Sequence, residues 1–217
     1  MKMNELTKRI LSIIFILPVT IYFVLKGFFL FNIFLIFFCV LALREWQKIS
    51  KNNIFCFPGI FFILFSFYTV SNIRNSDFNF GLNNFLFIFF ICVSSDVGGY
   101  VFGKLFKGPK LTRISPNKTY AGVFGGFILA IMASVFMLTN NLNPKMDNFL
   151  TSSNALILIF SFFLSAINQI GDLVISYFKR ISGFKDTGNV IPGHGGILDR
   201  IDGMIFTFPI FYLINLF

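Results

Sequence analysis

Long apolar runs, separated by short polar segments, fill most of the chain. A run of about 20 largely apolar residues can cross the hydrocarbon core of a bilayer as an α-helix. The first two runs of this chain meet at Lys26–Gly27, which predicts a tight hairpin, and the last run is short. The pattern predicts an all-α, polytopic membrane bundle of about seven transmembrane helices, at residues 10–25, 27–43, 54–72, 84–101, 120–139, 153–175 and 203–217.

The charges between these runs orient the bundle. The N-terminal tail and the segment 104–118 are basic, whereas the loops after the third and fifth runs each carry one base and one acid. The loop expected after the second run is also basic, with Arg44, Glu45, Lys48 and Lys51. Because cytoplasmic loops are enriched in Lys and Arg, we expect the N-terminus and the basic loops to face the cytoplasm.

Composition supports a membrane protein. Of the 217 residues, 56% are hydrophobic and 12% are charged, which is too little polar surface for a soluble domain. The net charge of +9 then bears on topology and anionic lipids, and no nucleic-acid partner is expected. We expect one integral membrane domain over residues 1–217, with N-terminal spans in 1–80 and catalytic spans and loops in 84–217. The compact length favours a bacterial inner (cytoplasmic) membrane.

Small residues mark one face of the fifth run. They recur at every fourth position, which places them on one side of a helix and permits close helix contact. This stripe predicts either a packing seam within the chain or the face of a homodimer, and it consists of Gly122, Gly126, Ala130 and Ser134.

Polar residues mark one face of the sixth run. They are spaced three or four apart, and an Asp within a membrane costs roughly 3 kcal/mol on insertion scales. We therefore expect the stripe to face protein or a water-filled cavity, with hydrogen bonding between helices as the structural alternative. Its members are Ser161, Ser165, Asn168, Asp172 and Ser176.

A second polar group follows the fourth run. Asp96 lies near the cytoplasmic end of that run, where an isolated acid must reach water or find a partner. The basic segment beyond it ends in Ser115–Pro116–Asn117–Lys118–Thr119. Hydroxyls, an amide and a lysine in a rigid turn suit a phosphate group. The alternative is that the bases only fix topology and bind lipid headgroups.

The C-terminal part of the chain gathers acids, bases and glycines. Asp199 and Asp202 are three residues apart, so a helix would place them on one face, and Asp172 could complete an oxygen site. Carboxylates without a Cys or His set favour Mg²⁺ or Mn²⁺ over zinc. The alternative is Asp–Lys and Asp–Arg pairs that neutralise one another. His194, between glycines, either caps the turn or contacts phosphate.

These residues form an ordered pattern, Ser176-x₂-Lys179–Arg180-x₄-Lys185–Asp186-x₅-Pro192-x-His194–Gly195–Gly196-x₂-Asp199–Arg200-x-Asp202. The pattern resembles the signature of phosphatidate cytidylyltransferases (CDP-diacylglycerol synthases). Asp96-x-Gly98 and the Ser115–Thr119 turn with Gly122 resemble a second region of that family, and the likeness covers residues 94–203. Relatives commonly have an acid where this chain has Ala121. The resemblance implies CTP and phosphatidate as substrates, and CDP-diacylglycerol and pyrophosphate as products.

The residues and the resemblance together assign roles. We expect Asp172, Lys179, Asp199 and Arg200 to act in catalysis. Asp172 and Asp199 are the expected primary Mg²⁺ ligands, with Asp202 and Asp186 second in rank, and Asp96 either binds a second cation or orients a lysine. Phosphates and substrates are expected to contact Ser115, Asn117, Lys118, Thr119, Ser176, Arg180, Lys185, His194, Gly195 and Gly196.

Two rival functions stay open from sequence. A CTP-dependent membrane lipid kinase shares the nucleotide and the membrane, and differs in releasing CDP instead of pyrophosphate. A cation or proton transporter could use Asp96 and Asp172 as a relay. Transporter sites lie near the membrane midplane, whereas the polar groups of this chain collect at one face.

Overall fold

A computed structural model describes residues 18–50, 54–76, 80–112, 115–140, 142, 144, 153–188, 190 and 195–216. Five helices in this part of the chain are long and apolar enough to cross a membrane. They are α2 (Phe28–Ser50), α3 (Cys56–Asn75), α4 (Phe80–Phe106), α5 (Tyr120–Thr139) and α6 (Asn154–Ile181). The short helix α7 (Leu198–Ile201) and the apolar helix α8 (Met204–Leu216) follow. The predicted all-α membrane bundle is confirmed.

Helices lie at six of the seven predicted runs. Three of them extend well beyond the predicted ends: α2 to Ser50, α4 to Phe106 and α6 to Ile181. Of the first run, residues 18–26 are helical, and residues 10–17 lie outside the described residues. The helix stops at Gly27, whose φ of +63° belongs to the left-handed region that favours glycine. There the Arg74 guanidinium donates to the carbonyls of Val24 and Leu25, at 2.7 and 3.1 Å. The chain thus breaks between two helices at the position where the sequence predicts a tight hairpin.

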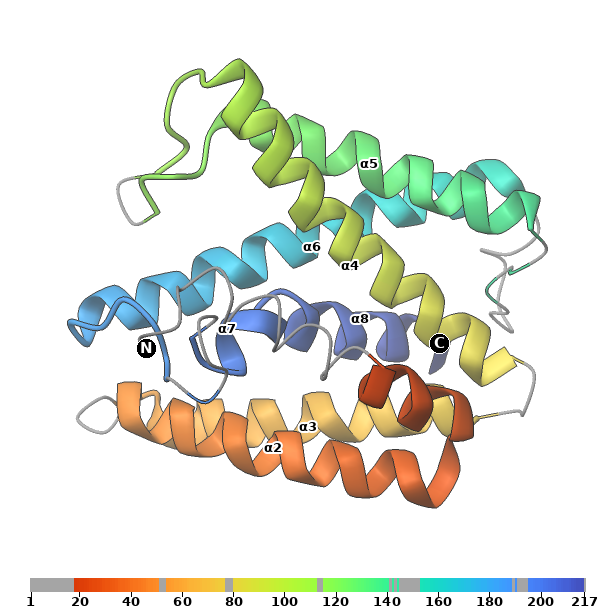
Figure 1. Ribbon diagram of the computed structural model, residues 1–217, viewed down its shortest axis with the longest axis horizontal. Coiled ribbons are helices and arrows are strands. Elements are labelled where there is room, and N and C mark those ends of the chain that lie inside the picture. The colour runs from red at the N-terminus through yellow and green to blue at the C-terminus, as the bar shows by residue number, and fades with distance from the viewer. Residues whose placement is uncertain are drawn as a thin grey trace, which may run out of the picture.

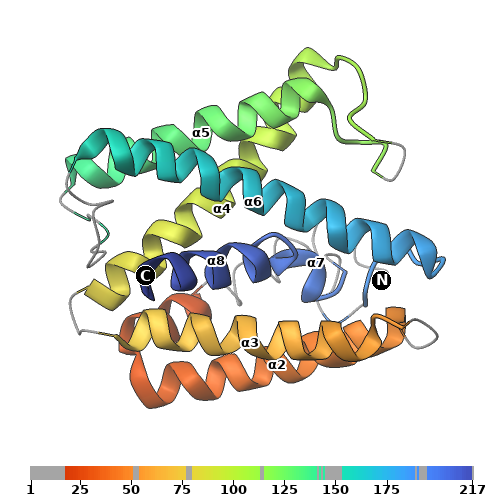
Figure 2. The ribbon, with the colours of Figure 1, turned by 180° about the vertical axis from the view of Figure 1, so that it is seen from behind.

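Successive helices run in opposite directions (Figures 1 and 2). The C-terminal ends of α2, α4 and α6 lie at one end of the bundle together with α7, and the C-terminal ends of α3, α5 and α8 lie at the other. The helix ends that adjoin the basic segments of the sequence therefore gather on one side, which we call the basic end. This alternation is what the charge pattern predicts.

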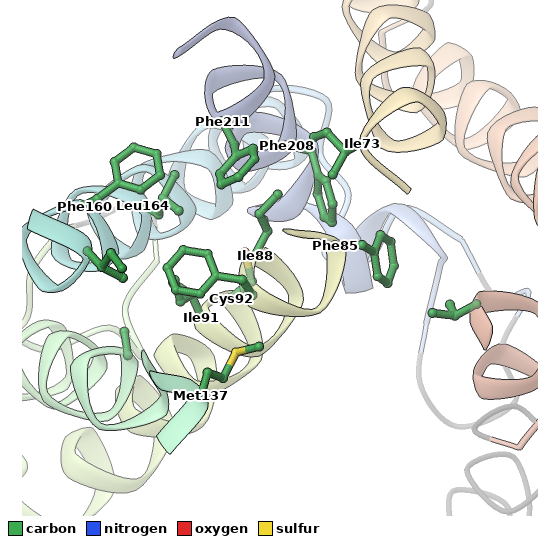
Figure 3. Packing of buried hydrophobic residues seen from close by; sticks show 14 of the residues in the cluster. Ile73, Phe85, Ile88, Ile91, Cys92, Met137, Phe160, Leu164, Phe208 and Phe211 are labelled. Atoms are coloured by element: carbon green, nitrogen blue, oxygen red, sulfur yellow. The ribbon is translucent and has the colours of Figure 1, made fainter. Parts of the chain in front are cut away.

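The main core surrounds α4, which crosses the other helices diagonally (Figure 1). Ile88 and Ile91 of α4 are fully buried, and Figure 3 shows them between side chains of α6 and α8, such as Leu164 and Phe211. A second apolar cluster lies at the basic end and joins α2, α3, α6, α7 and α8. It contains Ala42, Trp46, Ile49, Ile63, Ile175, Leu198 and Ile205.

Glycines bring α4 and α5 into backbone contact. A Cβ atom at Gly98 would lie 2.3 Å from the Gly125 carbonyl oxygen, and one at Gly122 would lie 2.7 Å from the Gly99 carbonyl oxygen. No side chain fits at either position, so the two helices cross closely here. The small-residue stripe of α5 is therefore a packing seam within the chain. A homodimer stays a prediction.

Candidate active site

The polar face of α6 points into the protein, as predicted. Ser161, Ser165 and Asn168 are fully buried. The Ser165 and Ser95 hydroxyls lie 2.8 Å apart, and the Asn168 side-chain amide donates to Asp96 Oδ1 at 2.8 Å. These contacts fix α6 against α4 and place Asp96 beside the part of α6 that carries Asp172.

Asp172 lies at the wall of a cavity between α4, α5 and α6. Lys118 Nζ is 2.6 Å from Asp172 Oδ2, and it also lies 3.3 Å from the Gln169 carbonyl oxygen, to which it donates. Ser176 donates to Asp172 Oδ1 at 3.2 Å. The cavity holds about 230 Å³, and its polar lining includes Asp96, Asn117, Lys118, Thr119 and Asp172. We call it the acidic cavity.

The turn before α5 presents Lys118 to this cavity. Thr119 caps α5 by accepting from the Gly122 N–H at 3.1 Å. An isolated bridge pairs Lys110 with Thr119, and the Lys118 N–H donates to the Ser115 carbonyl at 3.1 Å. The predicted phosphate-binding turn thus forms a closed loop at the basic end, with Asn117 and Lys118 facing the cavity.

Asp202 feels the charges of two other carboxylates, Asp172 and Asp96. Burial raises its pKa, and the negative charges of Asp172 and then Asp96 raise the pKa further, whereas Lys179 lowers it. The Gly203 N–H donates to Asp202 Oδ1 at 2.9 Å. Carboxylate oxygens are the ligands that Mg²⁺ prefers, so the chemistry of Asp96, Asp172 and Asp202 suits this ion.

The acids predicted to bind metal do not form a single cluster. Within the described ranges, no three His, Cys, Asp or Glu side chains stand close enough together to form a ready metal centre. The metal-binding roles of Asp96, Asp172, Asp186, Asp199 and Asp202 therefore stay predictions.

Asp199 lies in a different setting. Lys179 Nζ is 2.8 Å from Asp199 Oδ1, while the N–H groups of Thr187 and Gly196 donate to Oδ2 at 2.8 and 3.0 Å. Burial tends to raise the pKa of Asp199, but these hydrogen bonds and the lysine charge outweigh it and lower the pKa. Asp199 is thus an ionised carboxylate with donors on both oxygens. We call Lys179, Thr187, Gly196 and Asp199 the Asp199 network.

The other predicted residues lie around these two groups. Arg180 of α6, Arg200 of α7, and Lys185 and Asp186 of the loop after α6 are all exposed. Gly195, with φ of +86°, adjoins Asp199. His194 lies outside the described residues.

Sequence reasoning missed Glu45. It assigned this residue to a loop after the second run, but α2 continues to Ser50 and Glu45 is only 5% exposed. The carboxylate accepts hydrogen bonds from the Thr187 hydroxyl and from the N–H groups of Ile197 and Leu198. Charged residues at the end of an apolar run do not end a helix, since Glu, Lys and Arg are good helix formers. The one signal in the sequence was the position of Glu45 next to Trp46, a large apolar residue that favours a buried setting.

Comparison with known proteins agrees with this geometry. A model of the "Cytidylyltransferase family" matches residues 54–217. A phosphatidate cytidylyltransferase of Bacillus subtilis (strain 168) is 39% identical over 189 residues, which cover 82% of this chain and 65% of that protein. One of Rickettsia bellii (strain RML369-C) is 33% identical over 218 residues, covering 98% of this chain and 91% of the relative.

The chain thus spans slightly less than two thirds of the Bacillus relative and nearly all of the Rickettsia relative. The family match covers every residue of the acidic cavity and of the Asp199 network. The resemblance seen in the charged pattern is confirmed over most of the chain: this integral membrane protein belongs to the cytidylyltransferase family.

Proposed function

We propose that this protein transfers the cytidylyl group of CTP to phosphatidate, giving CDP-diacylglycerol and pyrophosphate for phospholipid synthesis. The observation that carries the proposal is the acidic cavity, where Lys118 and Asp172 meet beside Asp96 at the basic end of a membrane bundle. The relatives named above are phosphatidate cytidylyltransferases. A cavity of this kind can receive a soluble nucleotide from one side and a lipid phosphate from the membrane.

The basic end faces the cytoplasm of a bacterial inner membrane in this proposal. Support comes from the excess of Lys and Arg in the segments that adjoin this end, which is the side that such segments occupy. CTP arrives from the same compartment, and phosphatidate arrives sideways from the inner leaflet.

The nucleophile is a phosphate oxygen of phosphatidate. Phosphomonoesters such as phosphoserine lose their second proton at a pH of about 6, so this oxygen is already anionic and needs no strong general base. It forms a bond to the α-phosphorus of CTP, while the bond from that phosphorus to the bridging oxygen of the β-phosphate breaks. Pyrophosphate carries away the electron pair.

The chain's own residues position the substrates and offset negative charge. Lys118 lies at the wall of the acidic cavity. Lys179 extends from the face of α6 that also carries Asp172, and it pairs with Asp199. In this proposal each lysine contacts phosphate oxygens. Positioning and charge stabilisation supply most of the catalysis in phosphoryl transfer. Thr119, Asn117 and Ser176 offer further polar groups beside Lys118 and Asp172.

Mg²⁺ is the cofactor in this proposal. Asp172 and Asp202 would hold it, and Asp96 would either join them or bind a second cation. When bound, the ion would neutralise charge on the phosphates. Asp199 would have to release Lys179 or a backbone N–H in order to join this ligand set.

The test is pyrophosphate release by the purified full chain in detergent, with CTP and Mg²⁺, with and without phosphatidate. We expect pyrophosphate and CDP-diacylglycerol in equal amounts, and only when phosphatidate is present. Release of CDP with a doubly phosphorylated lipid would indicate a lipid kinase instead. If neither product forms with any phosphatidate, the proposal is wrong.

A further inference from the structure

We propose that Glu45 of α2 is a positioning residue of the active site. It holds residues 187–188 and 195–198, which we call the segment around Glu45, and thereby fixes Asp199 and Lys179. This inference deepens the proposed function and rests on it. Glu45 precedes residue 54, at which the family match begins. The proposal therefore gives the N-terminal helices a part in catalysis beyond anchoring the chain.

The Glu45 carboxylate accepts three hydrogen bonds from one segment. Thr187 Oγ1 and the Leu198 N–H donate to Oε2, each at 2.8 Å, and the Ile197 N–H donates to Oε1 at 2.9 Å. Hydrogen bonds to a charged carboxylate are roughly twice as strong as neutral ones. Two ends of the segment, around 187 and around 197, are thus tied to the same side chain of α2.

Two glycines allow this close approach. A Cβ atom at Gly188 would lie 2.7 Å from Glu45 Oε1, and one at Gly196 would lie 2.5 Å from Oε2. Neither distance leaves room for a methyl group. The backbone of the segment therefore closes around the carboxylate, which supplies a physical reason for glycine at position 196.

Thr187 links Glu45 directly to Asp199. Its hydroxyl donates to Glu45, and its N–H donates to Asp199 Oδ2 at 2.8 Å. Gly196, packed against Glu45, donates its own N–H to the same Asp199 oxygen. A displacement of Glu45 is thus passed to Asp199 through two residues, and from Asp199 to Lys179 through their ion pair.

The apolar surroundings make the hydrogen bonds necessary. Trp46 and Ala42, the neighbours of Glu45 on α2, belong to the cluster at the basic end, and so does Leu198 of α7. A buried carboxyl group is costly unless it is hydrogen-bonded, so Glu45 depends on its contacts with Thr187, Ile197 and Leu198.

The test compares Glu45→Gln with the wild type. The substitution keeps the size of the side chain but removes the charge. It also replaces one acceptor oxygen with an NH₂ group, which cannot accept from the backbone N–H that it faces, Ile197 or Leu198. We expect kcat/KM for pyrophosphate release to fall about 10- to 100-fold, the range typical of residues that orient groups at a catalytic centre. Glu45→Asp, which keeps the charge, should recover part of the loss.

Hydrogen exchange gives a readout that does not depend on turnover. In Glu45→Gln the amides of Thr187, Ile197 and Leu198 should exchange faster, while the amides of α4 and α5 keep their wild-type rates. Ser50→Ala is the matched control, because Ser50 is also buried on α2 and its hydroxyl donates only within the helix, to the Trp46 carbonyl. It should retain wild-type kcat/KM and wild-type exchange.

Three results would overturn the proposal: kcat/KM of Glu45→Gln within twofold of wild type, an equal loss in Ser50→Ala, or faster exchange throughout the bundle. If the wild type itself releases no pyrophosphate, the proposed function fails. The exchange experiment would then still show whether Glu45 holds the segment.

Discussion

Among the described residues, Asp172 and Asp199 each form an ion pair with a lysine, and their surroundings differ. The Asp172 side chain is 29% exposed at the wall of the acidic cavity, with Asp96 and Asp202 as acidic neighbours. The Asp199 side chain is 9% exposed and has a donor on each oxygen. Asp172 can exchange its contacts for a ligand at little structural cost, whereas Asp199 is part of the scaffold. Under the proposed function, we expect Asp172 to meet substrate or metal and Asp199 to hold the site together.

The largest effect is expected for Asp172→Asn. It should lower pyrophosphate release by about 10³-fold, the upper range for losing one preorganised charge-stabilising group. The melting temperature in detergent should stay close to that of the wild type, since the Lys118–Asp172 pair is partly exposed and such pairs contribute about 0–1 kcal/mol. Wild-type turnover in this variant would remove Asp172 from the catalytic site.

Asp199→Asn should reduce both turnover and stability. It removes a charge that is buried against Lys179 and leaves that lysine unpaired, a change that typically costs about 3–5 kcal/mol. A thermal melt alongside Asp172→Asn measures the contrast. Equal melting temperatures for the two variants would mean that the two acids do not differ as described.

Gly196→Ala probes the Asp199 side without changing any charge. The added methyl group would lie 2.1 Å from Thr187 Oγ1, so the segment must shift away from Glu45. We expect a loss of about 10-fold or more in kcat, as for other substitutions that displace orienting groups. A variant as active as the wild type would show that the close packing at this glycine is not needed.

Lys118→Ala should give the smallest of these effects, and on the Asp172 side. Without its lysine, the acidic cavity holds phosphate less well, so KM for CTP or phosphatidate should rise about 10-fold while the melting temperature changes little. Initial rates at varied concentrations of each substrate identify which phosphate it contacts. An unchanged KM for both substrates would exclude Lys118 from binding.

Much of the fold could be predicted because run length alone determines where a membrane helix can form. The main error was the end of α2, where Arg44, Glu45 and Lys48 continue the helix to Ser50. The hydrophobic pattern marks where a helix leaves the membrane, and a helix can extend well beyond that point.

The buried polar face of α6 could also be predicted from the sequence. The three- and four-residue spacing on α6 placed Asp172 on a buried face, and the structure confirms that face. The pairs Asp172–Lys118 and Asp199–Lys179 depend on how the helices pack, so the spacing of residues along the chain does not predict them. Glu45 was missed because its partners are mostly backbone N–H groups of a distant segment.

The most direct test of the account is the thermal shift produced by CTP with Mg²⁺ in the wild type, Asp172→Asn and Ser50→Ala. A ligand that binds the folded state raises its melting temperature. The account predicts a clear increase for the wild type and for Ser50→Ala, and almost none for Asp172→Asn. An equal increase in all three would show that the nucleotide binds away from the acidic cavity, and would contradict the central claim.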